Sequence, residues 1–348
     1  MTNAFTSSGL FGGLFCDPSV AAQFGSAAML RHMLAFEAAW TGALRDCGGV
    51  PAADAAQALA VIAGFIPPDL GADSDRDGLP VPALVAALRA GQPAPVTRAI
   101  HSGATSQDVL DTAMVLACLA VLDDLAGRLT GVIGRIENLN TRCGANPLMA
   151  RTRMQAALPA TVSLRVDAWR RALAGHQDRL GPLRQDMAQV QVGGAIGLRD
   201  AQGDAMAAHV AQALGLQTGP VWHSDRSRFV ALGHWLVLVA GTLGKIGQDV
   251  ALMAQQGIDD IILQGGGGSS AMAHKHNPIS AEVMVTLARY TAGQQGILAQ
   301  AMVHEQERSG AAWALEWLTL PAMAEATAAA LRHADRLLAS VDRLGGPL

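Results

Sequence analysis

The sequence is poor in charge, in lysine, in aromatic residues and in paired cysteines. Charged residues make up 16% of the 348 residues, against about 25% in a typical soluble domain, and hydrophobic residues make up 50%. This balance excludes an intrinsically disordered chain, which needs the opposite composition. The net charge of −4, without basic clusters, weighs against nucleic acid or anionic lipid as a partner.

Segments that would direct the chain to a membrane or out of the cell are also lacking. The most apolar run, residues 229–241, is shorter than the roughly 20 residues of a membrane span and contains His234. No basic segment precedes an apolar one at the N-terminus, so we expect no secretory signal. The four cysteines show neither a CxxC pair nor a zinc-ligand spacing, which indicates reduced thiols in a cytoplasmic protein.

Small residues are abundant instead, with glycine at 38 of the 348 positions. A low-charge chain of this length has more apolar surface to bury than one globule comfortably hides. We therefore expect a sizeable subunit interface. A plain alanine-rich monomer is the alternative.

Helical spacing dominates the distribution of polar and apolar residues. Proline and glycine interrupt the first hundred residues, leaving helical stretches over 28–46 and 52–62. From Thr105 onward, polar residues recur at helical spacing in long segments. These segments are residues 106–140, 159–190, 226–263, 278–308 and 313–344.

Segments of this length indicate a long helical bundle. Pro182 and Pro321 are expected to kink or interrupt two of the helices, and no strand or hairpin pattern is apparent. The sequence thus predicts an all-α protein. Its expected parts are a small helical N-terminal domain over residues 1–104 and a five-helix bundle domain over residues 105–348.

Reactive side chains concentrate between two of the long segments, over residues 264–278. Four consecutive glycines fit no packed helix, and they are followed by Ser269, Ser270, Lys275, His276 and Asn277. Pro278 stands where a helix would begin, so the free amides of that helix start should favour an anion. Lysine occurs elsewhere only at position 245, which sets Lys275 apart. A glycine linker with incidental polar residues is the alternative.

Three segments of the chain resemble motifs of the fumarase/aspartase superfamily. GSSAMAHKHNP (268–278) resembles its signature loop, usually written GSSxMPxKxNP. HSGATSQDVLDTA (101–113) and ARTRMQAALPAT (150–161) resemble its TSxD and RTxxQxAxPxT regions. Three dispersed matches in the family's order are far more specific than one short motif. The GATSQD wording and HEQERSGAAWALEWLTLP (304–321) are similar to the branch of cycloisomerases that act on 3-carboxy-cis,cis-muconate.

This resemblance implies the activity and the residues of the site. It implies closure of 3-carboxy-cis,cis-muconate to a lactone in protocatechuate breakdown, without metal or organic cofactor, in a homotetramer whose active sites are shared between subunits. It gives Ser269 the proton transfer and gives Lys275 and Asn277 the stabilisation of charge. The substrate, a small tricarboxylate, would contact His101, Thr105, Ser106, Arg153, Gln155, Ser270, Met272, His276 and Arg308.

Several positions depart from the family pattern. Arg153 stands where superfamily lyases that act on succinyl adducts have histidine and where the cycloisomerase branch has tryptophan, and Ala273 replaces the proline of the loop. The chain stops just after the fifth long segment, which predicts a truncated or absent C-terminal domain. An adenylosuccinate-type lyase and a catalytically silent scaffold stay open as alternatives. For Arg308, an ion pair with Glu305 three residues earlier is also open, and structural roles are expected for His223, His234, Trp313 and Trp317.

Overall fold

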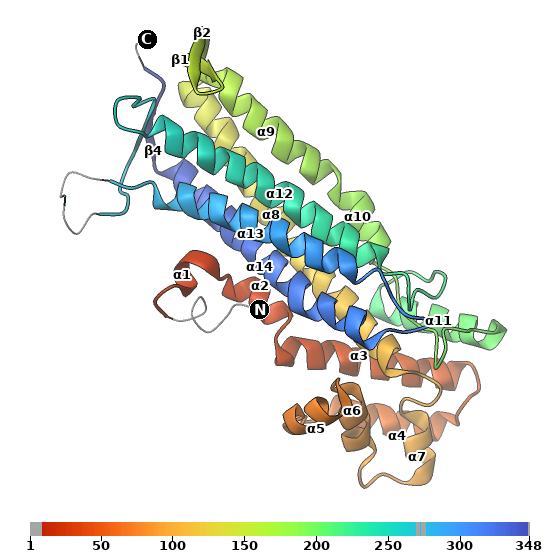
Figure 1. Ribbon diagram of the computed structural model, residues 1–348. Coiled ribbons are helices and arrows are strands. Elements are labelled where there is room, and N and C mark those ends of the chain that lie inside the picture. Colours follow the sequence, from red (N-terminus) through yellow and green to blue (C-terminus); the bar gives the residue numbers. More distant parts are fainter. Residues whose placement is uncertain (1–8, 269–271, 273–275, 347–348) are drawn as a thin grey trace.

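The computed structural model describes residues 9–268, 272 and 276–346, and it is a long helical bundle with further helices, most of which lie at one end (Figure 1). The bundle consists of α8 (Ser106–Cys143), α9 (Val162–Asp178), α10 (Leu180–Met187), α12 (Ser227–Met253), α13 (Ile279–Gln300) and α14 (Gly310–Ala339). At one end lie α3 (Ser26–Asp46), α4 (Ala52–Ala63), α5 (Gly71–Asp77), α6 (Val81–Arg89), α7 (Ala94–Ala99) and α11 (Ala201–Leu214). Two short helices, α1 (Gly12–Phe15) and α2 (Pro18–Gln23), lie along the side of the bundle.

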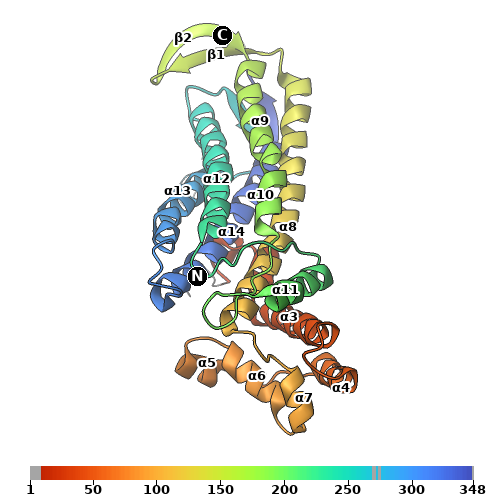
Figure 2. The ribbon, with the colours of Figure 1, turned by 90° about the vertical axis from the view of Figure 1, so that its right-hand side faces the viewer.

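The expected absence of strands is wrong in two places. Strands β1 (Pro147–Thr152) and β2 (Gln155–Thr161) form an antiparallel hairpin at the end of the bundle opposite α3–α7, as Figure 2 shows. Strands β3 (Ile261–Leu263) and β4 (Val341–Leu344) form a second antiparallel pair. The predicted helices that began at 159 and ended at 263 and 344 are therefore shorter, because their ends are extended.

The two prolines act differently on their helices. The segment predicted over 159–190 divides at Arg179 into α9 and α10, and Pro182 lies in the first turn of α10, where a missing amide proton costs little. Pro321 lies inside α14, which continues without interruption to Ala339. Of the two effects expected at this proline, a kink or an interruption, the interruption does not occur.

Helices α12, α13 and α14 pack closely because glycines face the contact. A Cβ on Gly244 would lie 2.5 Å from the Cβ of Ala288, and one on Gly247 would lie 2.5 Å from the carbonyl oxygen of Ala281. Both neighbours belong to α13. By length and composition α12 could also cross a membrane, but 56% of its apolar window is buried inside the protein. It is a core helix of the bundle.

Candidate active site

The first turn of α8 is built by the TSxD motif. Thr105 is the N-cap, and it forms a capping box with Asp108: the threonine side chain accepts from the Asp108 amide, and the Asp108 carboxylate accepts from the Thr105 amide at 3.0 Å. Ser106 is the first residue of the helix. The motif therefore fixes where the helix begins and leaves the Ser106 side chain at its positive end.

Asp108 also ties this helix start to the Val192–Gly197 segment. Its side chain is fully buried and accepts hydrogen bonds from the amides of Gly193 at 2.8 Å and Gly194 at 3.0 Å. The Nε2 atom of His223 lies 3.2 Å from the same carboxylate. A Cβ on Gly193 would come within 2.6 Å of Val221, so only glycine fits this close approach. The structural role expected for His223 agrees with this geometry.

Arg308, in the segment between α13 and α14, also contacts the first turn of α8 and the Val192–Gly197 segment. Its Nε donates to Oε1 of Gln107 at 2.7 Å, and its Nη2 donates to the Ala195 carbonyl at 3.3 Å. Residues 305–308 are not helical, so the ion pair with Glu305 that a helix would favour does not form in the structure. Among the described residues, Arg308 has no carboxylate partner, and it is exposed.

His101 lies just before this helix, in a turn held by α3. Its Nδ1 lies 2.7 Å from Oε1 of Glu37, a carboxylate with no exposed surface, while the imidazole keeps 14% of its surface exposed. Its backbone has a φ of +60°, in the left-handed region that histidine seldom adopts. Trp40 and Thr41 donate to carbonyls of the same turn at 3.0 and 2.8 Å. The strained conformation is thus imposed by its surroundings.

A buried cluster of ion pairs stabilises the first turns of α8. Arg226 donates to both carboxylate oxygens of Asp111 at 2.7 and 2.8 Å, and to both of Glu316 at 2.7 and 2.6 Å. All three side chains are at most 2% exposed. Trp313 donates its indole N–H to Asp111 at 2.9 Å, which gives this tryptophan a structural role.

Burial shifts the ionisation of this cluster. The pKa of Arg226 is raised by the two carboxylates, which outweigh its desolvation, so the guanidinium stays charged. Desolvation raises the pKa of Glu316 to about 7, and the charge of Asp111 acts in the same direction. His304, which precedes Arg308, has a lowered pKa because it is buried, and the charge of Arg226 acts in the same direction.

Two predicted substrate contacts lie at the far end of the molecule. Arg153 is in the turn of the β1–β2 hairpin and Gln155 begins β2. Helix α8 runs between this hairpin and Thr105, and its 38 residues span about 57 Å at 1.5 Å per residue. No small molecule contacts both ends of such a helix. The structure of one chain therefore does not bring Arg153 and Gln155 to Arg308.

The signature loop lies in neither of these two regions, the first turn of α8 and the hairpin, but between α12 and α13. Gly267 and Asn277 exchange backbone hydrogen bonds of 3.0 and 2.9 Å, which closes the base of the loop just before α13 begins. His276 adjoins this base, and Met272 is 45% exposed. The predicted Ser269, Ser270 and Lys275 lie outside the described residues, as does Ala273.

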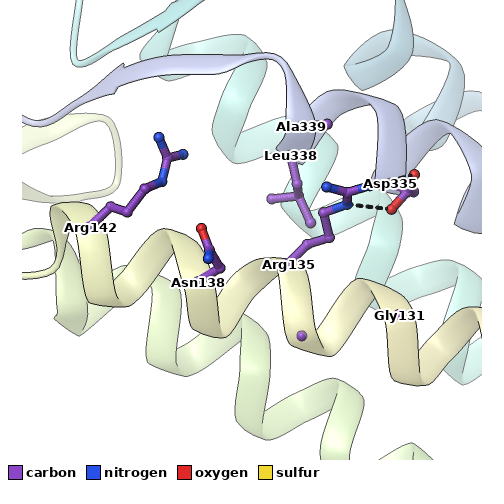
Figure 3. A pocket seen from close by; sticks show the side chains of 8 residues that line it. Gly131, Arg135, Asn138, Arg142, Asp335, Leu338 and Ala339 are labelled. Carbon is purple, nitrogen blue, oxygen red and sulfur yellow. Dashed lines mark hydrogen bonds and ion pairs between the residues drawn. The ribbon is translucent and has the colours of Figure 1, made fainter.

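Few of the predicted site residues line the cavities elsewhere in the chain. Figure 3 shows a groove of about 630 Å³ between α8 and α14, in which Arg135 pairs with Asp335 at 2.6 Å and Arg142 lies nearby. None of the predicted site residues lines it. Among the described residues, no group of three or more His, Cys, Asp or Glu side chains is arranged to hold a metal ion.

We call the residues gathered about the first turns of α8 the α8 cluster: Glu37, His101, Thr105, Ser106, Gln107, Asp108, Asp111, Arg226 and Arg308. Some of them were not singled out from the sequence. Gln107 and Asp108 lie inside the TSxD motif, so their position was a usable signal. Asp111 lies in the same quoted segment, residues 101–113, and so had this signal as well. Glu37 and Arg226 lie outside the three matched segments, and their importance arises from contacts between distant segments of the chain.

Comparison with known proteins identifies the family. A lyase family profile matches residues 81–293, more than half of the chain. The chain belongs to the lyase family of the fumarase/aspartase superfamily. This confirms the resemblance carried by the three motifs.

Individual members of the lyase family extend the match to nearly the whole chain. It is 36% identical to the 3-carboxy-cis,cis-muconate cycloisomerase of Pseudomonas aeruginosa over 96% of its own length and 75% of that protein's. Its structure matches the 3-carboxy-cis,cis-muconate lactonizing enzyme of Pseudomonas putida with a TM-score of 0.88 and 31% identity, over 97% of this chain and 77% of that one. A fumarate lyase from Mesorhizobium gives the same TM-score at 26% identity, over 95% and 76% of the two chains.

Proposed function

We propose that this chain is a cycloisomerase that closes 3-carboxy-cis,cis-muconate to 4-carboxymuconolactone in the cytoplasm. The observation that carries the proposal is the α8 cluster, in which Arg308 binds Gln107, in the first turn of the helix that Thr105 and Ser106 begin, and has no carboxylate partner among the described residues. Such an arginine suits one carboxylate of a substrate that has three. The 36% and 33% identity to two 3-carboxy-cis,cis-muconate cycloisomerases supports this compound as the substrate.

The reaction adds a carboxylate oxygen of the muconate to a carbon–carbon double bond and so forms the lactone C–O bond. The π electrons move to the neighbouring carbon, where a new C–H bond forms, so each turnover consumes one proton. In this proposal Ser269 gives that proton, and in reverse it is the base of a β-elimination. Lys275, Asn277 and the start of α13 stabilise the charge that develops on the adjoining substrate carboxylate.

Because the group that leaves in the reverse reaction is a carboxylate, it needs no protonation on departure. A general acid is therefore dispensable at position 153. There Arg153, in place of histidine, would instead bind a second substrate carboxylate. Neither step calls for a metal or an organic cofactor.

A complete site requires other copies of the chain in this proposal. The 38 residues of α8 separate Thr105 from the hairpin by about 57 Å, and the 22 residues of α13 separate the signature loop from the segment before α14 by about 33 Å. Exposed apolar side chains support an interface: Met154 and Leu158 on the hairpin, and Ile297, Met302 and Val303 at the end of α13. We propose a homotetramer whose sites combine segments of different chains.

The test is an ultraviolet assay on purified protein. Loss of the conjugated diene absorbance of 3-carboxy-cis,cis-muconate is expected for the wild type and not for Ser269→Ala, which should keep the same oligomeric state. Turnover of adenylosuccinate alone, measured in parallel, would replace the proposal with an adenylosuccinate-type lyase. Inactivity on both would favour a silent scaffold, and a Ser269→Ala variant with wild-type rate would remove Ser269 from the chemistry.

A further inference from the structure

Arg308 is held in place by acceptors that carry no charge. Its Nε donates to the side-chain amide oxygen of Gln107 at 2.7 Å, and its Nη2 donates to the backbone carbonyl of Ala195 at 3.3 Å. Neutral acceptors fix the direction of a guanidinium without cancelling its charge. A carboxylate in place of Gln107 would form an ion pair with Arg308 and leave less attraction for a ligand.

The orientation of the Gln107 amide is itself determined by its neighbours. The side chain is fully buried, and its Nε2 donates to Oδ2 of Asp111 at 3.0 Å and to the His223 carbonyl at 2.8 Å. Both neighbours are acceptors, so the opposite orientation would place the amide oxygen against a carboxylate and a carbonyl. Only the observed orientation leaves Oε1 free to accept from Arg308.

Asp111 gives this arrangement a rigid base. Its two oxygens already accept from Arg226 at 2.7 and 2.8 Å, and Trp313 holds one of them at 2.9 Å. None of these side chains is more than 3% exposed. The contacts therefore form an ordered path from a buried ion pair, through one amide, to an exposed cation.

We propose that Gln107 is a positioning residue that aims Arg308 at a ligand carboxylate and preserves its positive charge. It acts through Arg308 and does not touch the ligand. The inference rests on the proposed function for the identity of the substrate and for its three carboxylates. Arg308 by itself, with no carboxylate partner among the described residues, calls for a ligand that bears at least one carboxylate.

The experiment measures binding of propane-1,2,3-tricarboxylate, an unreactive tricarboxylate, to the full-length protein by titration calorimetry. Arg308→Met is expected to weaken binding about tenfold or more, since it removes a charge-assisted contact. Gln107→Met is expected to weaken binding about fivefold, and the double variant should bind no more weakly than Arg308→Met alone. The matched control is Gln177→Met, whose amide donates to Thr130 on the surface at 2.7 Å; it should bind as the wild type does.

Three results would overturn the inference. If the effects of Gln107→Met and Arg308→Met multiply, Gln107 acts on the fold and not through Arg308. If Gln107→Glu binds the tricarboxylate as tightly as the wild type, the neutrality of this residue is irrelevant. If the wild type does not bind the tricarboxylate, Arg308 has no such ligand to be aimed at.

Turnover provides an independent readout. If the cycloisomerase activity is present, Gln107→Met should raise KM about fivefold with kcat within twofold, because the lost contact is shared by substrate and transition state. A wild type that binds the tricarboxylate with the expected coupling, yet does not turn over the muconate, would refute the proposed reaction and leave the role of Gln107 intact.

Discussion

Glu37 is a carboxylate without exposed surface, and among the described residues its side chain pairs only with His101. Its second oxygen has no partner in the structure, an expensive arrangement for a buried group. His101 itself has a strained backbone, with a φ of +60°. The buried unpaired oxygen and the backbone strain are thus two energetic costs at the same turn. We interpret the pair as a device that directs Nε2 of His101 toward the ligand.

The first prediction therefore concerns Glu37→Gln, which keeps an acceptor for Nδ1 of His101 but removes the negative charge. KM for the proposed substrate should rise about tenfold, since a neutral amide holds the imidazole of His101 in place less firmly than a carboxylate does. Thermal melting should stay within a few degrees of the wild type. An unchanged KM would show that the pair serves the fold alone.

Glu316 provides the second residue-scale prediction. Its pKa is raised by burial to about 7, whereas the unfolded chain releases this proton near pH 4.5. Because the folded protein holds the extra proton between these values, the free energy of unfolding should fall as the pH rises from about 4.5 to 7, by up to roughly 3 kcal/mol, and then level off.

Urea unfolding of the wild type and of Glu316→Gln at several pH values checks this. The glutamine keeps two polar groups beside Arg226, but its amide has no proton to release in this range. The free energy of unfolding of the variant should therefore not show the fall between about pH 4.5 and 7. Identical pH profiles for the two proteins would assign the proton to another group.

At the scale of the element, the approach of α12 to α13 depends on individual glycines. In Gly247→Ala the new Cβ would lie 2.5 Å from a backbone carbonyl of α13, so the helices must separate, at a cost of about 2 kcal/mol. Gly241→Ala, on the same helix, meets nothing within 4 Å and should stabilise the protein by about 0.5–1 kcal/mol. Chemical unfolding of both variants gives the comparison, and equal effects would contradict the packing argument.

The helices were predictable to within a few residues at many ends, whereas the hairpin was not. Along β2 almost every residue is exposed, so the alternation of buried and exposed residues that marks a strand is missing. The turn gives no signal either, because Arg153 and Met154 adopt φ values of +51° and +68° where asparagine and glycine are usual. Helix α12 ends ten residues earlier than predicted, since Ile261–Leu263 pairs with the distant β4.

The residues of the candidate site likewise divide into those that could be predicted from the sequence and those that could not. The family resemblance singled out Thr105, Ser106, His101 and Arg308. The structure places them about the first turn of α8. The groups that orient them come from α3, α12 and α14, and such contacts depend on tertiary packing that no local pattern records. The sequence also could not decide between an ion pair and a free cation at Arg308, because that depended on whether residues 305–308 were helical.

At the scale of the whole molecule, the distances along α8 and α13 lead to the last prediction. If Ser269 and Arg308 enter one active site from different chains, Ser269→Ala and Arg308→Met should each be inactive as pure proteins but active when mixed. A site is intact when the chain that supplies each residue is wild type at that position. Random 1:1 mixing of a symmetric oligomer should then restore about one quarter of the wild-type rate.

The two variants are to be co-expressed with different tags and purified through both, so that only mixed oligomers are assayed. Ser269→Ala mixed with a second inactive variant of the same loop, Lys275→Met, is the matched control. Those two residues lie on one loop, so each chain supplies a defective loop to every site and no activity should return. Recovery in the first mixture but not in the second would establish that sites are shared between chains, because only then can one site receive an intact Ser269 and an intact Arg308 from two different variants. The length of α13, about 33 Å, is the structural reason to expect this result. Failure of both mixtures, with mixed oligomers present, would mean that Ser269 and Arg308 do not meet across subunits.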